Sequence, residues 1–116
     1  MTIEEIAGKA FHQENVEPDV ETFCRDKNIT SSVFFDMFAR YIATGYLAGR
    51  FTWDSSDAAM NVISGLMVVS PELPDFAWAL FIAFDDGEYH PRTEHLTSDE
   101  VTRPVVKALM ERYPTS

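Results

Sequence analysis

The chain has 116 residues, of which 46% are hydrophobic and 13% aromatic, so it has enough apolar material for one folded domain and too much for a disordered chain. Its 19 acidic residues outnumber its 9 basic ones and give a formal net charge of −10. This balance argues against nucleic acids and anionic membranes as partners, because both are bound through Lys and Arg. A single cysteine, Cys24, excludes an internal disulfide bond, and we expect a buried, unreactive thiol there.

No apolar run reaches the roughly 18 residues that a membrane-spanning helix needs, and the N-terminal stretch MTIEEIAGKAF lacks the basic and apolar segments of a signal peptide. We therefore expect a cytoplasmic protein. Its five glycines are scattered singly, so there is no phosphate-binding loop, and we expect no cofactor. The absence of repeats and linkers predicts one helical domain over residues 1–116, as a monomer or a homodimer.

The first two elements carry helix-start signals. Thr2 and Glu5 have the spacing of a reciprocal capping box, which predicts a helix over about residues 3–12. Pro18 suits the first position of a second helix, because its fixed φ angle is helical, and Asn28 is a plausible end.

A third helix is expected to begin at Thr30, Ser31 or Ser32 and to end at Gly49. Its apolar residues share one broad face, which predicts that this is the central helix. The face comprises Phe34, Phe35, Met37, Phe38, Tyr41 and Ile42. With Tyr46, its aromatic residues could line a ligand pocket, but core packing is the better interpretation.

A fourth helix is expected after the stretch FTW, with Asp54 or Ser55 as the N-cap and Asp57 in the first turn. The apolar residues then follow helical spacing as Ala59, Met60, Ile63, Leu66 and Met67. Gly65 is unfavourable inside a helix, so we expect a close approach of another helix there.

Residues 74–90 are ambiguous. Large apolar residues alternate from Phe76 to Phe84, and Asp86-Gly87 is a hairpin signal, so an α+β fold with a hairpin over residues 76–90 is one alternative. A buried helix over 74–85 with Gly87 as its C-cap is favoured, because three alanines suit a helix and the following residues are too polar for a partner strand.

The last element starts at a second capping box, Thr97 with Glu100. Pro104 is expected either to kink this helix or to restart it. Its apolar stripe is predicted to contain Val101, Val105, Leu109 and Met110. Together the elements predict an all-α fold, a single irregular domain of five to six helices.

The stretch AFDDGEYHP, residues 83–91, concentrates polar groups behind the ambiguous segment. Acidic side chains near the C-terminal end of a helix oppose its dipole, so their presence there suggests a use, although a solvated loop is the plainest interpretation. As a partner-binding surface, the candidate set is Asp85, Asp86, Glu88, Tyr89, His90 and Glu94, joined by Asp54, Asp57 and either Glu72 or Asp75. The same oxygen and nitrogen donors could hold a divalent metal, but their spacing fits no metal motif.

Catalytic signals are weak. Cys24 with His12, His90 or His95 could form a nucleophile and base pair, yet the cysteine falls on an apolar helical face with nothing beside it to activate the thiol. No serine stands in a nucleophile elbow. We therefore expect a protein that is not an enzyme.

In size, acidity, expected helix content and lack of a catalytic motif, the chain resembles small bacterial immunity proteins, which neutralise basic nuclease toxins. This likeness is one of class and carries over no functional residue. It implies a non-catalytic interaction protein that binds a basic protein partner, with charge attraction speeding the encounter. The alternative is a protein or enzyme that binds a small ligand or a divalent metal around residues 85–90.

Overall fold

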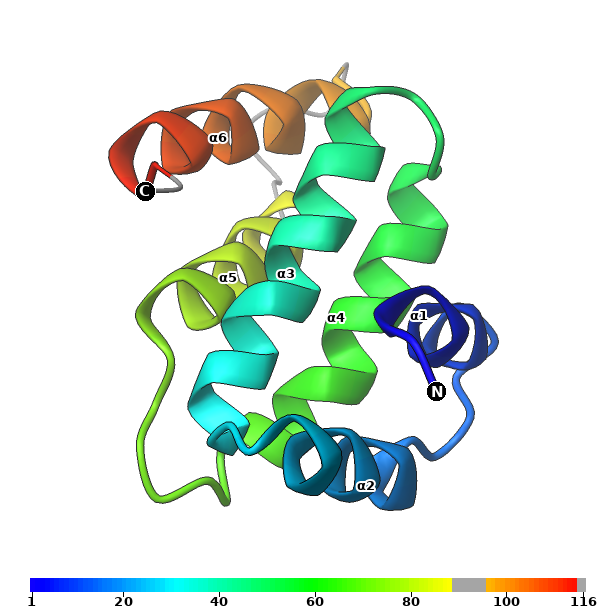
Figure 1. The fold of residues 1–116 in the computed structure, drawn as a ribbon. Coiled ribbons are helices and arrows are strands. Elements are labelled where there is room, and N and C mark those ends of the chain that lie inside the picture. Colours follow the sequence, from blue (N-terminus) through cyan, green and yellow to red (C-terminus); the bar gives the residue numbers. More distant parts are fainter. Residues whose placement is uncertain (89–95, 115–116) are drawn as a thin grey trace.

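The computed structural model describes residues 1–88 and 96–114, and over these ranges the chain forms six α-helices and no strand (Figure 1). The helices are α1 (Ile3–Phe11), α2 (Glu17–Lys27), α3 (Ser31–Leu47), α4 (Trp53–Met67), α5 (Asp75–Glu88) and α6 (Ser98–Arg112). The all-α fold is confirmed. The hairpin alternative is wrong, because residues 75–88 are helical.

Most of the expected helix ends are present. Both capping boxes form: the side chains of Thr2 and Thr97 each accept a hydrogen bond from the amide three residues on, and Glu5 and Glu100 return one. α2 begins one residue before Pro18 and ends at Asn28, which adopts the left-handed conformation with φ of 54°. Each of these ends is set by local hydrogen bonding, which explains why the sequence alone predicts it.

The start of α4 differs from the expectation. Thr52, not Asp54 or Ser55, is the N-cap, and its hydroxyl accepts a hydrogen bond from the Ser55 amide at 3.1 Å. The earlier start places Trp53 in the helix, where the indole Nε1 donates to the Thr102 hydroxyl of α6 at 2.9 Å. A tertiary contact thus accompanies the choice of Thr52 over Asp54 and Ser55 as the cap. As a result, Asp57 lies in the second turn of α4.

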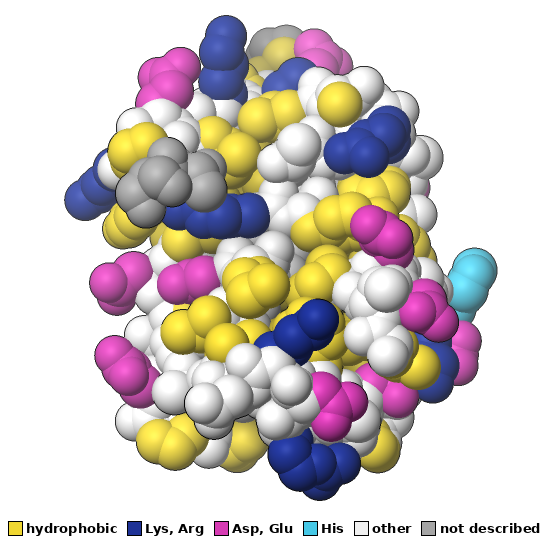
Figure 2. Space-filling model, in the orientation of Figure 1, with side chains coloured by type: hydrophobic (Ala, Val, Ile, Leu, Met, Phe, Trp, Pro, Cys, Tyr) yellow, Lys and Arg dark blue, Asp and Glu magenta, His cyan; other side chains and the backbone are white. Residues whose placement is uncertain are grey.

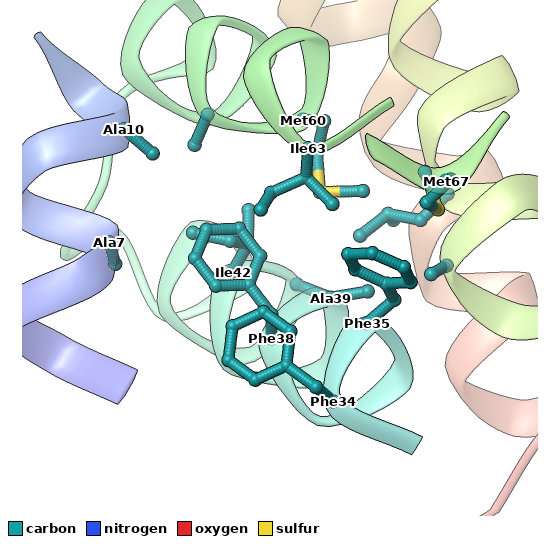
Figure 3. Close-up of a cluster of buried hydrophobic side chains, with 14 of the residues drawn as sticks. Ala7, Ala10, Phe34, Phe35, Phe38, Ala39, Ile42, Met60, Ile63 and Met67 are labelled. Atoms are coloured by element: carbon teal, nitrogen blue, oxygen red, sulfur yellow. The ribbon is translucent and has the colours of Figure 1, made fainter. Parts of the chain in front are cut away.

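α3 is the central helix and contacts each of the other five (Figure 1). Figure 3 shows its buried face meeting α1 and α4. The side chains labelled there come from these three helices: Phe34, Phe35, Phe38, Ala39, Ile42, Ala7, Ala10, Met60, Ile63 and Met67. Phe34, Phe35, Phe38 and Tyr46 are buried in the core, as expected, whereas Tyr41 is half-buried and Met37 is 42% exposed. Each large apolar side chain buried here stabilises the fold by about 1.5–3 kcal/mol.

Two glycines have roles opposite to those expected. Gly87 is not a C-cap, because it lies inside α5, which runs to Glu88. A methyl group at Gly87 would collide with the Thr102 side chain, so this glycine permits the close contact of α5 with α6. Gly65, in contrast, has open space around it, and the predicted close helix approach there is wrong.

α6 runs through Pro104 without a restart, and Pro104 is exposed. The predicted stripe is correct at Leu109 and Met110, which pack against the core, but wrong at Val105, which is 45% exposed. Thr102 and Val106 are fully buried instead. The register of α6 is fixed by polar contacts that a hydrophobic pattern does not report. Tyr46 donates a hydrogen bond to Oδ1 of Asp99 at 2.6 Å, in addition to the contact between Trp53 and Thr102. Across the described part of the chain, no helix has the length and apolar character to cross a membrane.

Candidate functional site

A hollow with a volume of about 560 Å³ lies where the end of α1, the first two-thirds of α4 and the end of α5 meet. We call it the acidic hollow. It is lined by Gln13, Asp54, Asp57, Ala58, Asn61, Val62 and Glu88.

Helical spacing explains how α4 supplies this lining. Asp54, Asp57 and Asn61 are separated by three and four residues, so they lie on one face of the helix. α4 packs against α5, and this contact brings Glu88, the last residue of α5, to the same hollow. Three carboxylates from two helices thus line one cavity.

Asp57 is the most perturbed of these carboxylates. Its Oδ1 is buried and has no hydrogen-bond partner among the described residues, while Oδ2 accepts a hydrogen bond from the Asn61 side chain at 3.3 Å. Burial, followed by the negative charges of Glu88, Asp85 and Asp54, raises the pKa of Asp57 to about 6. The charged form is therefore disfavoured by both desolvation and repulsion from its neighbours.

No cation of the described residues neutralises this hollow. The two ion pairs in the described part of the chain lie elsewhere, between Lys9 and Asp19 and between Asp99 and Arg103. A positively charged group that entered the hollow would pair with the exposed carboxylates of Asp54 and Glu88 and relieve the repulsion that they exert on Asp57. A guanidinium group is well suited to this task, because its several N–H donors bind carboxylates in a fixed geometry.

The structure brings together part of the predicted acidic surface. Asp54, Asp57 and Glu88 line the hollow, and Asp85 is close enough for its charge to raise the pKa of Asp57. Asp86 is exposed and does not line the hollow.

The remaining members of the set lie apart from the hollow or outside the described residues. Asp75 is at the opposite end of α5, where its charge acts on Asp36, and Glu72 is exposed in the preceding loop. Tyr89, His90 and Glu94 lie outside the described residues.

The hollow also contains residues that sequence reasoning missed. Asn61 could have been found, because it lies one helical turn after Asp57 and its amide is the donor to that carboxylate. Gln13 carries no such signal. It follows α1 in a left-handed conformation with φ of 59°, and only the packing of α1 on α4 brings it to the hollow.

The alternative functions, a metal site and a catalytic cysteine, have limited support among the described residues. Among residues 1–88 and 96–114, no three His, Cys, Asp or Glu side chains are grouped so that they could hold a metal ion. Cys24 is half-buried, its Sγ contacts the carbonyl of Thr30 at 3.8 Å, and burial raises the pKa of its thiol. His12 is exposed at the end of α1, and His90 and His95 lie outside the described residues.

No protein-family model, no curated protein and no solved structure matches this chain.

Proposed function

We propose that the protein is a non-catalytic interaction protein that binds a basic protein partner through the acidic hollow. The observation that carries this proposal is the unpaired, buried oxygen of Asp57, held among carboxylates that no described cation neutralises. Keeping such a group charged lowers the stability of the free protein. The arrangement becomes favourable when a cation from a partner occupies the hollow.

The partner group that fits best is an arginine side chain presented on a convex part of the partner's surface. Its guanidinium would donate to the exposed carboxylates of Asp54 and Glu88, and its charge would offset the repulsion that they exert on the buried carboxylate of Asp57. The apolar stem of the arginine would contact Ala58 and Val62. Lysine would supply the charge without the forked geometry, so we expect it to bind more weakly.

The overall charge of the chain supports the same reading. A net charge of −10 attracts basic proteins over long range and raises their association rate at low ionic strength. Inhibition of a basic toxin, as by the immunity proteins that the chain resembles in class, is one role that such binding would serve. The single, partly buried Cys24 suits the reducing cytoplasm, where we place the encounter.

The test is a capture experiment with charge-matched variants. The immobilised protein is exposed to lysate of its source organism, and bound proteins are eluted with increasing salt. The hollow variant carries Asp54→Asn, Asp57→Asn and Glu88→Gln. The control variant carries three neutralised acids that lie outside the hollow and are exposed: Glu4→Gln, Asp26→Asn and Glu111→Gln.

We expect a basic protein that the parent and the control variant retain and that salt releases. The hollow variant should bind the purified partner at least about tenfold more weakly, because close interfacial charge pairs contribute more than 1.4 kcal/mol. Equal binding by the hollow variant and the control variant would show that only net charge matters and would overturn the proposal.

A further inference from the structure

A second open groove, with a volume of about 440 Å³, runs between α1, α3 and α6. We call it the arginine groove. It is lined by Ile3, Met37, Arg40, Tyr41, Thr44, Arg50 and Met110. The lining contains two arginines and no carboxylate, in a chain where acidic residues outnumber basic ones by 19 to 9. The local charge of this groove is therefore opposite to that of the molecule as a whole.

Both arginines are held against aromatic rings. The guanidinium of Arg40 lies 4.6 Å from the centre of the Phe76 ring, and that of Arg50 lies 5.7 Å from the centre of the Phe51 ring. Stacking of this kind restricts the direction of a guanidinium, and the exposed Arg50 can still donate from its N–H groups. In Figure 2, Lys and Arg side chains (dark blue) gather in the upper half of the view, around α6 and the C-terminal end of α3.

The arginines lack anionic partners within the described residues. Neither forms one of the ion pairs found there, and the Nη1 of Arg40 is buried without a hydrogen-bond acceptor. Asp36 is a carboxylate whose charge interacts with that of Arg40, but it accepts a hydrogen bond from the Ala77 amide at 2.9 Å. Because this nitrogen is shielded from solvent, an anionic occupant of the groove would be attracted by the charge of Arg40 and would accept hydrogen bonds from the exposed Arg50.

The remaining lining is apolar and adaptable. Met37 is 42% exposed, and Ile3, Tyr41 and Met110 are partly buried against the core, so the groove presents side chains already held in place at their base. Methionine side chains adjust to the shape of an apolar partner. The groove is open, whereas small-molecule sites enclose most of the ligand surface. An extended partner such as a helix suits it better.

We propose that the arginine groove binds an acidic amphipathic helix of a second protein. Apolar residues of that helix would pack on Met37, Tyr41 and Met110, and carboxylates on its flank would pair with Arg40 and Arg50. This is the helix-in-groove mode of recognition, with charge complementarity at the edges of the groove. The surface is separate from the acidic hollow and shares no residue with it.

The test uses a panel of designed helical peptides with an apolar stripe of Leu, Ile or Phe flanked by Glu. A second panel replaces each Glu with Gln. Binding is followed through the methyl NMR signals of the five methionines, which provide an internal comparison. Met37 and Met110 line the groove, whereas Met60 and Met67 are fully buried in the core.

Variants separate the groove from net charge. Arg50→Gln alters an exposed residue, and the double variant adds Arg40→Gln. The control variant, Arg25→Gln with Lys27→Gln, removes the same two charges from exposed positions of α2. Thermal unfolding of each variant verifies that it is folded, and Arg50→Gln keeps the test decisive should the double variant lose its fold.

We expect acidic peptides to shift the signals of Met37 and Met110 and to leave those of Met60 and Met67 nearly unchanged. The double variant should bind about tenfold more weakly and Arg50→Gln about threefold, because each loses charge-assisted hydrogen bonds, while the control variant should match the parent. Three results would each overturn the proposal: no binding by any acidic peptide, equal binding by the Gln panel, or equal weakening in the control variant. Laurate, a small amphiphile with a carboxylate, is titrated in the same way. If laurate shifts the signals of Met37 and Met110 and no peptide does, the proposal is overturned and the groove is assigned to a small amphiphile.

Discussion

Asp57 gives the sharpest prediction, because its carboxylate destabilises the fold in which it lies. Replacing it by asparagine removes the charge and retains the shape of the side chain. In the folded protein the pKa of Asp57 is raised from an ordinary value of 3.8 to about 6. The folded state therefore binds this proton more tightly than the unfolded chain, and the contribution of Asp57 to stability falls as the pH rises from about 4 to about 6.

The magnitude follows from the size of that difference. At about 1.4 kcal/mol for each pH unit, the interval between 3.8 and about 6 corresponds to about 3 kcal/mol. Solvent reaches part of the side chain and screens the charges, so we reduce the expected gain for Asp57→Asn to about 1–2 kcal/mol at pH 7–8. Near pH 4 the parent carboxyl is protonated in the fold, and the two proteins should be about equally stable.

The assay is thermal and urea unfolding of parent and variant at intervals from pH 4 to pH 8. A gain of about 1–2 kcal/mol corresponds to a melting temperature higher by about 4–8 °C at pH 8. Asp86→Asn, at an exposed residue of α5 outside the hollow, is the matched control and should change stability by no more than about 0.5 kcal/mol. If Asp57→Asn is less stable than the parent at pH 8, or if the difference in stability between the two does not vary with pH, the Asp57 carboxylate does not destabilise the fold.

Other predictions concern the packing of α6 and the ends of helices. Gly87→Ala should lower the free energy of unfolding by about 1–3 kcal/mol, because the added methyl group meets the Thr102 side chain of α6. Gly65→Ala should raise the free energy of unfolding by up to about 1 kcal/mol, because alanine has the higher helix propensity and the space around Gly65 is open. The urea midpoints of the two variants measure this difference, and equal effects would contradict the packing of α5 on α6. Tyr46→Phe should lower the free energy of unfolding in urea by about 1–2 kcal/mol, because it removes the 2.6 Å hydrogen bond to Asp99. An unchanged free energy of unfolding would show that this hydrogen bond does not anchor α6. The hydrogen bond from Tyr46, together with Arg103, lowers the pKa of Asp99. The stabilisation from the Asp99 carboxylate should therefore be present at neutral pH and disappear only on acidification below about pH 4. Urea unfolding of the parent and of Tyr46→Phe at low pH measures this loss.

The parts of the fold that follow from local chemistry could be predicted from the sequence. The capping boxes at Thr2 and Thr97, the left-handed Asn28 and the apolar face of the central helix each depend on residues close together in the chain. The helical state of residues 75–88 could also be predicted, because its alanines outweigh the strand-like alternation around them.

The errors arise where distant residues decide the outcome. Gly87 looks like a helix end, but Thr102, 15 positions later in the sequence, makes a glycine necessary inside the helix. The N-cap of α4 lies two or three residues before the position that the sequence predicts for a similar reason, because Trp53 makes its hydrogen bond to α6 from within the helix.

The candidate site shows the same division. Local spacing relates Asp54 to Asp57 and Asp85 to Glu88, but the sequence cannot show that α4 and α5 pack so that these charges act on one another. The contribution of Gln13 and the separation of Asp75 from the hollow likewise depend on tertiary packing.

The most direct test of the acidic hollow as a binding site is a carboxyl-carbon NMR titration of Asp57, with and without an arginine-containing peptide taken from the contact surface of the captured partner. We expect a pKa near 6 for Asp57 in the free protein and a clear decrease when the peptide is bound, because the guanidinium stabilises the charged form. A pKa near 4 in the free protein, or a value that the bound peptide leaves unchanged, would contradict this expectation.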